Sequence, residues 1–200
     1  MTEVREAAVA DLGGIVSLHL VAFEGYFLSQ LGAGFLRVLY DGFLIDPSGI
    51  LLVAERGARP VGFIAGTVAP QRFFGRLLRR RGLELAVASA SALMRSPVGV
   101  GRRLVRGLAY RGEKPAALVD AGLLSSVAVH PHEKGTGLGR LLVESFCSTA
   151  KQRGCSSVYL TTDRDGNEGT NGFYLAVGFR LESELSRSGG RRMNRYVRVI

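Results

Sequence analysis

Residues 120–140 read DAGLLSSVAVHPHEKGTGLGR, and this stretch decides the fold. The apolar run 123–129 predicts a buried strand, which ends at the turn His130-Pro131. A glycine loop (134–139) follows, and then a predicted helix (140–152). The first N–H groups of a helix lack intrahelical partners and lie at the positive end of its dipole, while glycines let the backbone approach an anion closely. This order therefore predicts a phosphate-binding site.

The glycine spacing excludes two common phosphate-binding loops. A P-loop has its lysine after the second glycine, whereas Lys134 precedes the glycines here. The dinucleotide fingerprint is Gly-x-Gly-x-x-Gly, whereas residues 135–139 are Gly-x-Gly-x-Gly. The stretch instead resembles the central motif of the GNAT superfamily of acyl-CoA-dependent N-acyltransferases. That motif is a strand ending in Val-x-Pro, then Arg/Gln-x-x-Gly-x-Gly/Ala opening a helix. Val129-His130-Pro131 and 134–139 fit it, with Lys134 where Arg or Gln is usual.

A second block of sequence carries the same resemblance. A strand is followed by Asn167 at a predicted helix start, by the pair Phe173-Tyr174 and by Gly178-Phe179, all at the spacing of the family. The resemblance covers residues 120–179 well and the N-terminal third loosely.

For the fold, the resemblance implies a single α/β domain over residues 1–200. Its central β-sheet is expected to be twisted, flanked by helices, and mixed as in α+β proteins, with both parallel and antiparallel strands. The order of the predicted elements agrees with it. We expect strands at 4–7, 50–55, 61–68, 123–129, 157–161, 180–186 and 193–200, and helices at 11–23, 27–43 and 140–152.

A basic insert of about fifty residues, 70–118, does not belong to the order of the family. It holds eleven basic residues against two acids, so its net charge of +9 equals that of the whole chain. We predict two or three helices that leave the sheet next to the acyl-transfer centre and draw in an anionic acceptor or an anionic membrane surface. Nucleic acid is not favoured, because few aromatic residues interleave with the arginines. The insert could instead only shield the hairpin or make a homodimer contact.

Composition gives the remaining expectations. No run of about 18 uncharged apolar residues exists, so we expect no transmembrane helix. The N-terminus lacks an apolar signal segment. Cys147 and Cys155 form no Cys-x-x-Cys pair, and we interpret them as core residues of a protein in the reducing cytoplasm. With three scattered histidines, no metal site is expected.

The expected ligand is acetyl-CoA. Backbone N–H groups of the glycine loop are the candidates for its diphosphate, and the Lys134 side chain adds charge. The pantetheine arm would pair like an extra strand with the exposed backbone of Val127 and Val129 in strand 123–129. The resemblance places the arm in a splay between this strand and strand 157–161, with Asn167 on the far side, where Asn167 could also only cap the helix. An N–H near Val129 would polarise the acetyl carbonyl. The candidate cofactor-binding residues are Val127, Ala128, Val129, Lys134, Gly135, Thr136, Gly137, Leu138, Gly139, Arg140 and Asn167.

Tyr174 is the candidate general acid. A phenol with a pKa of about 10 can give its proton to a thiolate leaving group, and the resemblance implies the same role. The alternative is a core tyrosine beside Phe173. The general base stays open, because strand 122–127 carries no acid where many relatives have one. Asp120, Asp163, Glu24 and water are the candidates.

These residues predict an N-acetyltransferase that moves an acetyl group from acetyl-CoA to a primary amine of a small molecule, by direct attack in a ternary complex. A nucleotide-linked amino sugar is one candidate acceptor. The alternative hypothesis is a non-catalytic or regulatory CoA-binding domain of the same fold, which docks on an anionic polymer or membrane surface through the basic insert. Tyr174 and the intact glycine loop favour the enzyme, whereas the missing strand acid leaves the alternative open.

Overall fold

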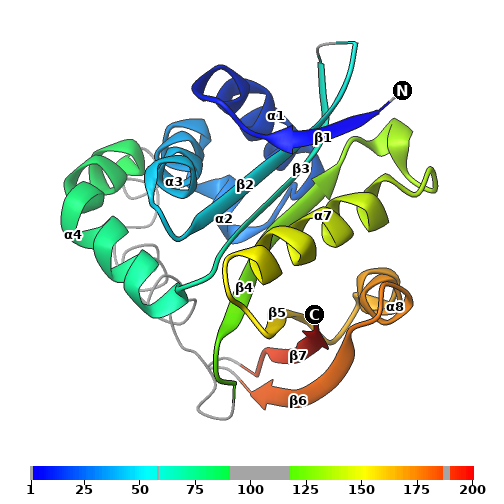
Figure 1. Ribbon diagram of the computed structural model, residues 1–200. Coiled ribbons are helices and arrows are strands. Elements are labelled where there is room, and N and C mark those ends of the chain that lie inside the picture. Colours follow the sequence, from blue (N-terminus) through cyan, green and yellow to red (C-terminus); the bar gives the residue numbers. More distant parts are fainter. Residues whose placement is uncertain (1, 58, 91–117, 187–189) are drawn as a thin grey trace.

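The computed structural model describes residues 2–57, 59–90, 118–186 and 190–200. Within these residues the centre is a seven-stranded mixed sheet with strand order β1-β2-β3-β4-β5-β7-β6 (Figure 1). Neighbouring strands are antiparallel except β4 and β5, which are parallel. The strands are β1 (Glu3–Glu6), β2 (Gly49–Arg56), β3 (Arg59–Thr67), β4 (Ala121–Val129), β5 (Ser157–Asp163), β6 (Arg180–Ser186) and β7 (Arg192–Val199). The predicted mixed sheet is therefore confirmed.

Helices cover both faces of the sheet, as predicted (Figure 1). The first face carries the helices that precede β4 in the chain, and the second face carries those that follow it. The first group is α1 (Leu12–Ala22), α2 (Phe27–Gln30), α3 (Ala33–Ile45) and α4 (Pro70–Ala88), with the 3-10 turn η1 (Val9–Asp11). The second is α7 (Leu138–Gln152) and α8 (Glu168–Ala176), with the 3-10 turn η2 (Pro131–Glu133) between β4 and α7.

The central strands are buried on both faces. In β2, Leu51 and Val53 belong to the core under α1 and α3, whereas Leu52 and Ala54 belong to the core under α7. Adjacent strand residues point to opposite faces, so an uninterrupted apolar strand serves two cores at once. This explains why residues 50–54 lack the polar alternation of a half-exposed strand.

Two predicted helix boundaries were wrong. The helix expected at 27–43 is broken into α2 and α3, because Gly32 has φ +90°, a left-handed conformation that ends one helix before the next begins. α7 begins at Leu138 rather than Arg140, because Gly137 is its N-cap. Within the described part of the chain, no helix is long and apolar enough to cross a membrane.

The described part of the basic insert is one helix, α4, while residues 91–117 lie outside the described residues, so the predicted helix count stays untested there. Thr67 at the end of β3 pairs with Leu123, whereas Gly62 pairs with Val129. The insert therefore leaves the sheet where β4 begins. The nine residues of β4 span roughly 26 Å at about 3.3 Å per residue. The prediction that the insert starts next to the acyl-transfer centre, which we placed near Val129, was wrong.

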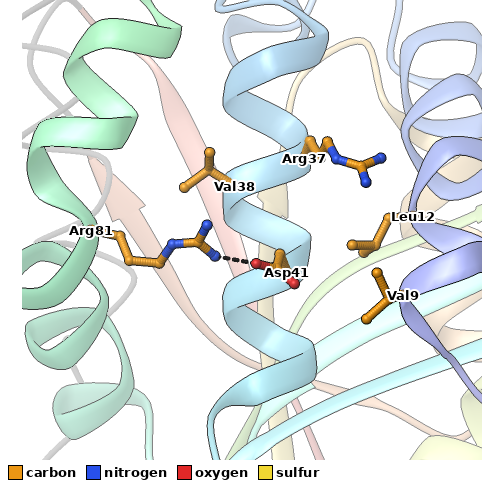
Figure 2. A pocket seen from close by; sticks show the side chains of 6 residues that line it. All are labelled: Val9, Leu12, Arg37, Val38, Asp41 and Arg81. Atoms are coloured by element: carbon orange, nitrogen blue, oxygen red, sulfur yellow. Dashed lines mark hydrogen bonds and ion pairs between the residues drawn. The ribbon is translucent and has the colours of Figure 1, made fainter.

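Two arginines hold α4 against the body of the protein. Arg81 pairs with Asp41 of α3 beside a small recess (Figure 2). Arg76 donates two hydrogen bonds to Asp46, at 2.6 and 2.7 Å. Burial alone would raise the pKa of Asp46, but the hydrogen bonds from Arg76 and Ser48 outweigh it and lower that pKa to about 2. These two arginines are therefore structural and unavailable to a partner.

Candidate active site

A gap in the sheet lies between the two parallel strands. β4 pairs with β5 only at Ala121, Gly122 and Leu123, although β4 continues to Val129 and β5 to Asp163. Beyond Leu123, the edge of β4 that faces β5 has no strand partner in the described part of the chain. Strand edges offer free N–H and C=O groups to an extended ligand. This is the splay that the family resemblance implied.

A β-bulge in β4 accompanies the gap. Ala65 pairs with Ser126, but the next residue, Gly66, pairs with Leu124, so Ser125 is an extra residue. A Cβ on Gly66 would lie 2.2 Å from the Leu123 carbonyl oxygen, which explains why this position is glycine. The bulge changes which face each later residue of β4 points to, because it breaks the alternation of the strand.

The glycine loop follows η2 at the open end of the gap. Gly135 and Gly137 have φ values of +80° and +85°, a left-handed conformation that favours glycine. The Thr136 N–H and hydroxyl both donate to the Glu133 carbonyl, at 3.3 and 2.8 Å. These bonds close a tight turn ahead of α7.

The start of α7 presents backbone donors. Its first helical hydrogen bond runs from the Leu141 N–H to the Gly137 carbonyl, at 3.1 Å. The N–H groups of Leu138, Gly139 and Arg140 therefore have no acceptor within the helix. Lys134 is exposed, and in the described part of the chain its side chain makes no hydrogen bond or ion pair. The predicted donors thus gather at one helix N-terminus, where an anion can bind.

α8 packs directly against this helix start. A Cβ on Gly139 would lie 3.3 Å from the Phe173 ring, so the glycine lets α8 approach. The Arg140 guanidinium donates to the Ala176 carbonyl at 2.8 Å and ties the two helices together. Tyr174 is therefore carried on a helix that borders the glycine loop.

Tyr174 is 7% exposed and lies among aromatic rings. Its ring centroid is 5.7 Å from that of Phe179 and 6.0 Å from that of Tyr196. Burial raises the pKa of the Tyr174 phenol well above its ordinary value of 10. In the described residues its hydroxyl makes no hydrogen bond. The phenol therefore keeps its proton at neutral pH, and its hydroxyl can donate a hydrogen bond to a ligand.

Asn171, which sequence reasoning missed, organises the turn between β5 and α8. Its side-chain N–H groups donate to the carbonyls of Asp163 and Asn167, at 3.0 and 2.8 Å, and its oxygen accepts from the Tyr196 hydroxyl at 2.9 Å. Asn167 donates to Thr162 Oγ1 at 2.8 Å. The side-chain nitrogen of Asn167 therefore already holds the end of β5. Any side-chain contact with a ligand is left to its amide oxygen, Oδ1. The signal was a pair of asparagines four residues apart, one helical turn.

The other face of the gap carries a charged recess. A hollow of about 460 Å³ is lined by residues 24–27, Gln30 and Arg191. Arg191 donates to both oxygens of Asp163, at 2.5 and 2.7 Å, and Asp163 ends β5. Phe27 packs against the core under α1 and α3. The recess therefore borders the end of β5 on the face opposite α7.

The candidate bases are placed differently. Glu24 is exposed in the recess. Asp163 is engaged by Arg191, a residue that sequence reasoning did not single out. Asp120 precedes β4 at the end where β4 and β5 still pair, and its carbonyl accepts from the Ser156 N–H at 2.9 Å. Since a base must reach the attacking amine, this geometry favours Glu24 or water over Asp120.

The two cysteines are both buried, as expected for core residues, and they form no disulfide with each other. Burial raises the pKa of Cys147 to about 11, so this residue remains a thiol at neutral pH. Among the residues that the structure describes, no three His, Cys, Asp or Glu side chains gather as a set of metal ligands.

The family model described as "Acetyltransferase (GNAT) family" matches residues 20–179. The chain belongs to this family. Its fold also matches the crystal structure of a putative GNAT-family acetyltransferase from Desulfovibrio desulfuricans, with a TM-score of 0.65, 16% identity, and coverage of 100% of this chain and 99% of that one. The resemblance seen in the sequence is thus confirmed at the level of family and fold.

Two curated relatives have named activities. The amino-acid acetyltransferase of Pseudomonas putida is 29% identical over 165 residues, which is 79% of this chain but 35% of the relative. The glucosamine 6-phosphate N-acetyltransferase of Trypanosoma brucei brucei is 33% identical over 66 residues, which is 33% of this chain and 42% of the relative. The chain thus spans about a third of the length of the first relative.

Proposed function

We propose that this GNAT protein is an N-acetyltransferase that moves the acetyl group of acetyl-CoA to the primary amine of a small molecule. One observation carries the proposal. The open end of the gap between β4 and β5 has the glycine loop and α8 on one face, and a recess with Glu24 on the other. Cofactor and acceptor can then approach one reaction centre from opposite faces, which suits direct attack in a ternary complex.

The cofactor would lie along the unpaired edge of β4. Its diphosphate binds backbone N–H groups within residues 135–140, chiefly those of Leu138, Gly139 and Arg140, with Lys134 adding positive charge. Its pantetheine amides pair with the backbone of Val127, Ala128 and Val129 as an added strand. An N–H of this edge polarises the thioester carbonyl and stabilises the oxyanion formed during attack.

The chemical step is an acyl transfer from sulfur to nitrogen. The neutral amine attacks the thioester carbonyl and forms the C–N bond, and the C–S bond then breaks. The departing thiolate takes the proton of the Tyr174 hydroxyl, which solvent later restores. The amine gives up one proton to water or to Glu24. Burial keeps the Tyr174 phenol protonated at neutral pH, and the same raised pKa makes it a weaker acid than an exposed tyrosine, so the role rests on the position of Tyr174 beside the glycine loop.

The acceptor we propose carries an anionic group as well as an amine. The recess contains the Glu24 carboxylate, which suits an amine, and the Arg191 guanidinium, which the Asp163 carboxylate already holds. The names of the two relatives, an amino-acid and a glucosamine 6-phosphate acetyltransferase, describe acceptors of this kind. The nucleotide-linked amino sugar predicted from the sequence belongs to the same class.

Release of free CoA thiol from acetyl-CoA tests this function directly. The panel should contain amino acids, amino sugar phosphates and nucleotide-linked amino sugars, each with its N-acetylated form as the matched control. We expect thiol release with at least one free amine and none with its acetylated partner. Acetyl-CoA binding without release for any amine would refute the enzyme and support the non-catalytic alternative.

One surface favours that alternative. The outer face of α4 combines exposed arginines with two exposed apolar residues, Leu83 at 80% and Val87 at 68%. Basic helices with an apolar component bind anionic membrane surfaces. We call the exposed arginines that form no ion pair in the described residues the outer arginines of α4: Arg72, Arg79 and Arg80. Arg81 is left out of this set, because Asp41 holds it.

A further inference from the structure

Glu133, the residue just before the glycine loop, carries a buried carboxylate. Glu133 is 7% exposed, and its Oε1 pairs with Arg56 Nη1 at 2.9 Å. Its other oxygen, Oε2, is buried and has no hydrogen-bond partner in the residues that the structure describes. A half-satisfied buried carboxylate is a costly arrangement, which calls for a reason at this position.

The backbone of Glu133 also forms the base of the loop. Its N–H donates to the His130 carbonyl at 2.8 Å, and its own carbonyl accepts from Thr136 twice. The turn over residues 133–136 keeps its end Cα atoms within about 7 Å. The Glu133 side chain thus stands on the residue that shapes the anion-binding turn, roughly 10 Å or less from an anion held there.

Arg56 comes from another part of the chain. It ends β2, next to the turn of the β2–β3 hairpin, and its guanidinium also donates to Thr2 Oγ1 at 3.2 Å. The hairpin and η2 are joined a second time, by the His130 N–H and the Val61 carbonyl at 2.8 Å. The hairpin is therefore a fixed support for the loop.

The charges explain why the two residues occur together. Alone, the Glu133 carboxylate would repel the diphosphate of acetyl-CoA, while Arg56 beside it makes the pair neutral. We propose that Arg56 and Glu133 act as a charge-balanced pair beside the glycine loop, in which Arg56 cancels the Glu133 charge that would otherwise oppose the bound diphosphate. This proposal rests on the proposed acetyl-CoA site and adds two residues that do not themselves touch the ligand.

A double-mutant cycle separates charge from structure. Arg56→Met keeps an unbranched apolar stem but removes the guanidinium and exposes the ligand to the Glu133 charge, so acetyl-CoA affinity should fall about tenfold, the size expected for a diphosphate roughly 10 Å from one unit charge near a protein surface. Glu133→Gln should bind at least as tightly as the unmodified protein. The double variant Arg56→Met/Glu133→Gln should return to within about threefold of it, because the offending charge is gone.

A matched control lies across the hairpin. Arg59 is the strand partner of Arg56, is exposed, and forms no ion pair in the described residues. Arg59→Met removes the same charge and should change the affinity by less than about threefold. The Arg56→Met defect should also shrink at high salt, whereas the loss of a structural contact would not.

Calorimetric titration of acetyl-CoA into the four variants and the unmodified protein measures the affinity of each. Thermal unfolding of the same five proteins shows whether each variant is folded. Recovery in the double variant supports the pair. A double variant as weak as Arg56→Met would overturn the proposal, because Arg56 would then contact the ligand or hold the loop by its bulk. Unchanged affinity in Arg56→Met would also overturn it. Failure of the unmodified protein to bind acetyl-CoA would instead refute the proposed function.

Discussion

Replacement of Gly137 is the perturbation whose effect follows most directly from the structure. Gly137 has φ +85°, and a Cβ built there meets nothing within 4 Å. Gly137→Asp and Gly137→Asn therefore both fit the space, and each costs about 1 kcal/mol of backbone strain. Asn and Asp both tolerate this conformation better than most residues do. Any difference between the two variants thus reports charge alone.

The magnitude follows from the position of Gly137 as the N-cap of α7. An anion held by the first N–H groups of the helix would lie roughly 5 Å from the new carboxylate. At that distance, each pair of unit charges repels by about 1 to 3 kcal/mol for effective dielectric constants between those of water and a protein surface. We expect Gly137→Asp to bind acetyl-CoA at least about thirtyfold more weakly than Gly137→Asn.

Calorimetric titration measures the difference, and Gly154→Asp is the matched control. Gly154 follows the other end of α7, has φ +88° and also has nothing within 4 Å of a built Cβ. It lies roughly 25 Å away along a helix that rises about 1.5 Å per residue. The control should lose stability but not affinity. Equal acetyl-CoA affinity in folded Gly137→Asp and Gly137→Asn would refute the assignment of the diphosphate to this loop.

Three further predictions follow from other sites. Tyr174→Phe should lower kcat about a hundredfold with unchanged acetyl-CoA affinity; full kcat would assign the proton to water. Because burial raises the pKa of Tyr174, this residue should cause no loss of kcat between pH 7 and about pH 9. Arg76→Met should lower the free energy of unfolding by about 2 kcal/mol at pH 7, since the pKa of Asp46 is lowered from 3.8 to about 2. That stability is present above about pH 4 and is lost as the pH falls towards 2. Denaturant titrations that find the same difference between Arg76→Met and the unmodified protein at pH 2 as at pH 7 would contradict this prediction. Replacing the outer arginines of α4 with Gln should reduce salt-sensitive sedimentation with anionic vesicles, whereas the triple control Arg59→Gln/Lys151→Gln/Arg180→Gln should not.

Local patterns in the sequence predicted most of the fold. The apolar strand before the glycine loop, and the spacing from Asn167 to Phe179, each lie within one short segment, so the order of residues specifies them. Gly32 was a weaker signal, because a glycine inside a helical pattern can either weaken the helix or end it. Only its left-handed backbone shows that it separates α2 from α3.

Long-range pairing could not be predicted in the same way. Arg56 and Glu133, or Asp163 and Arg191, meet because distant strands fix their positions, and no local pattern reports such a contact. The exit of α4 was mispredicted for the same reason. The direction of β3 relative to β4 decides which end of the sheet the insert leaves, and that direction comes from strand pairing.

The most direct test of the central proposal is a crystal structure of the protein with bound acetyl-CoA. We expect the diphosphate within hydrogen-bond distance of the N–H groups of residues 135–140, the pantetheine arm along the unpaired edge of β4, and the thioester sulfur facing the Tyr174 hydroxyl. A diphosphate bound away from the glycine loop, for example on the outer arginines of α4, with the gap between β4 and β5 empty, would contradict the account.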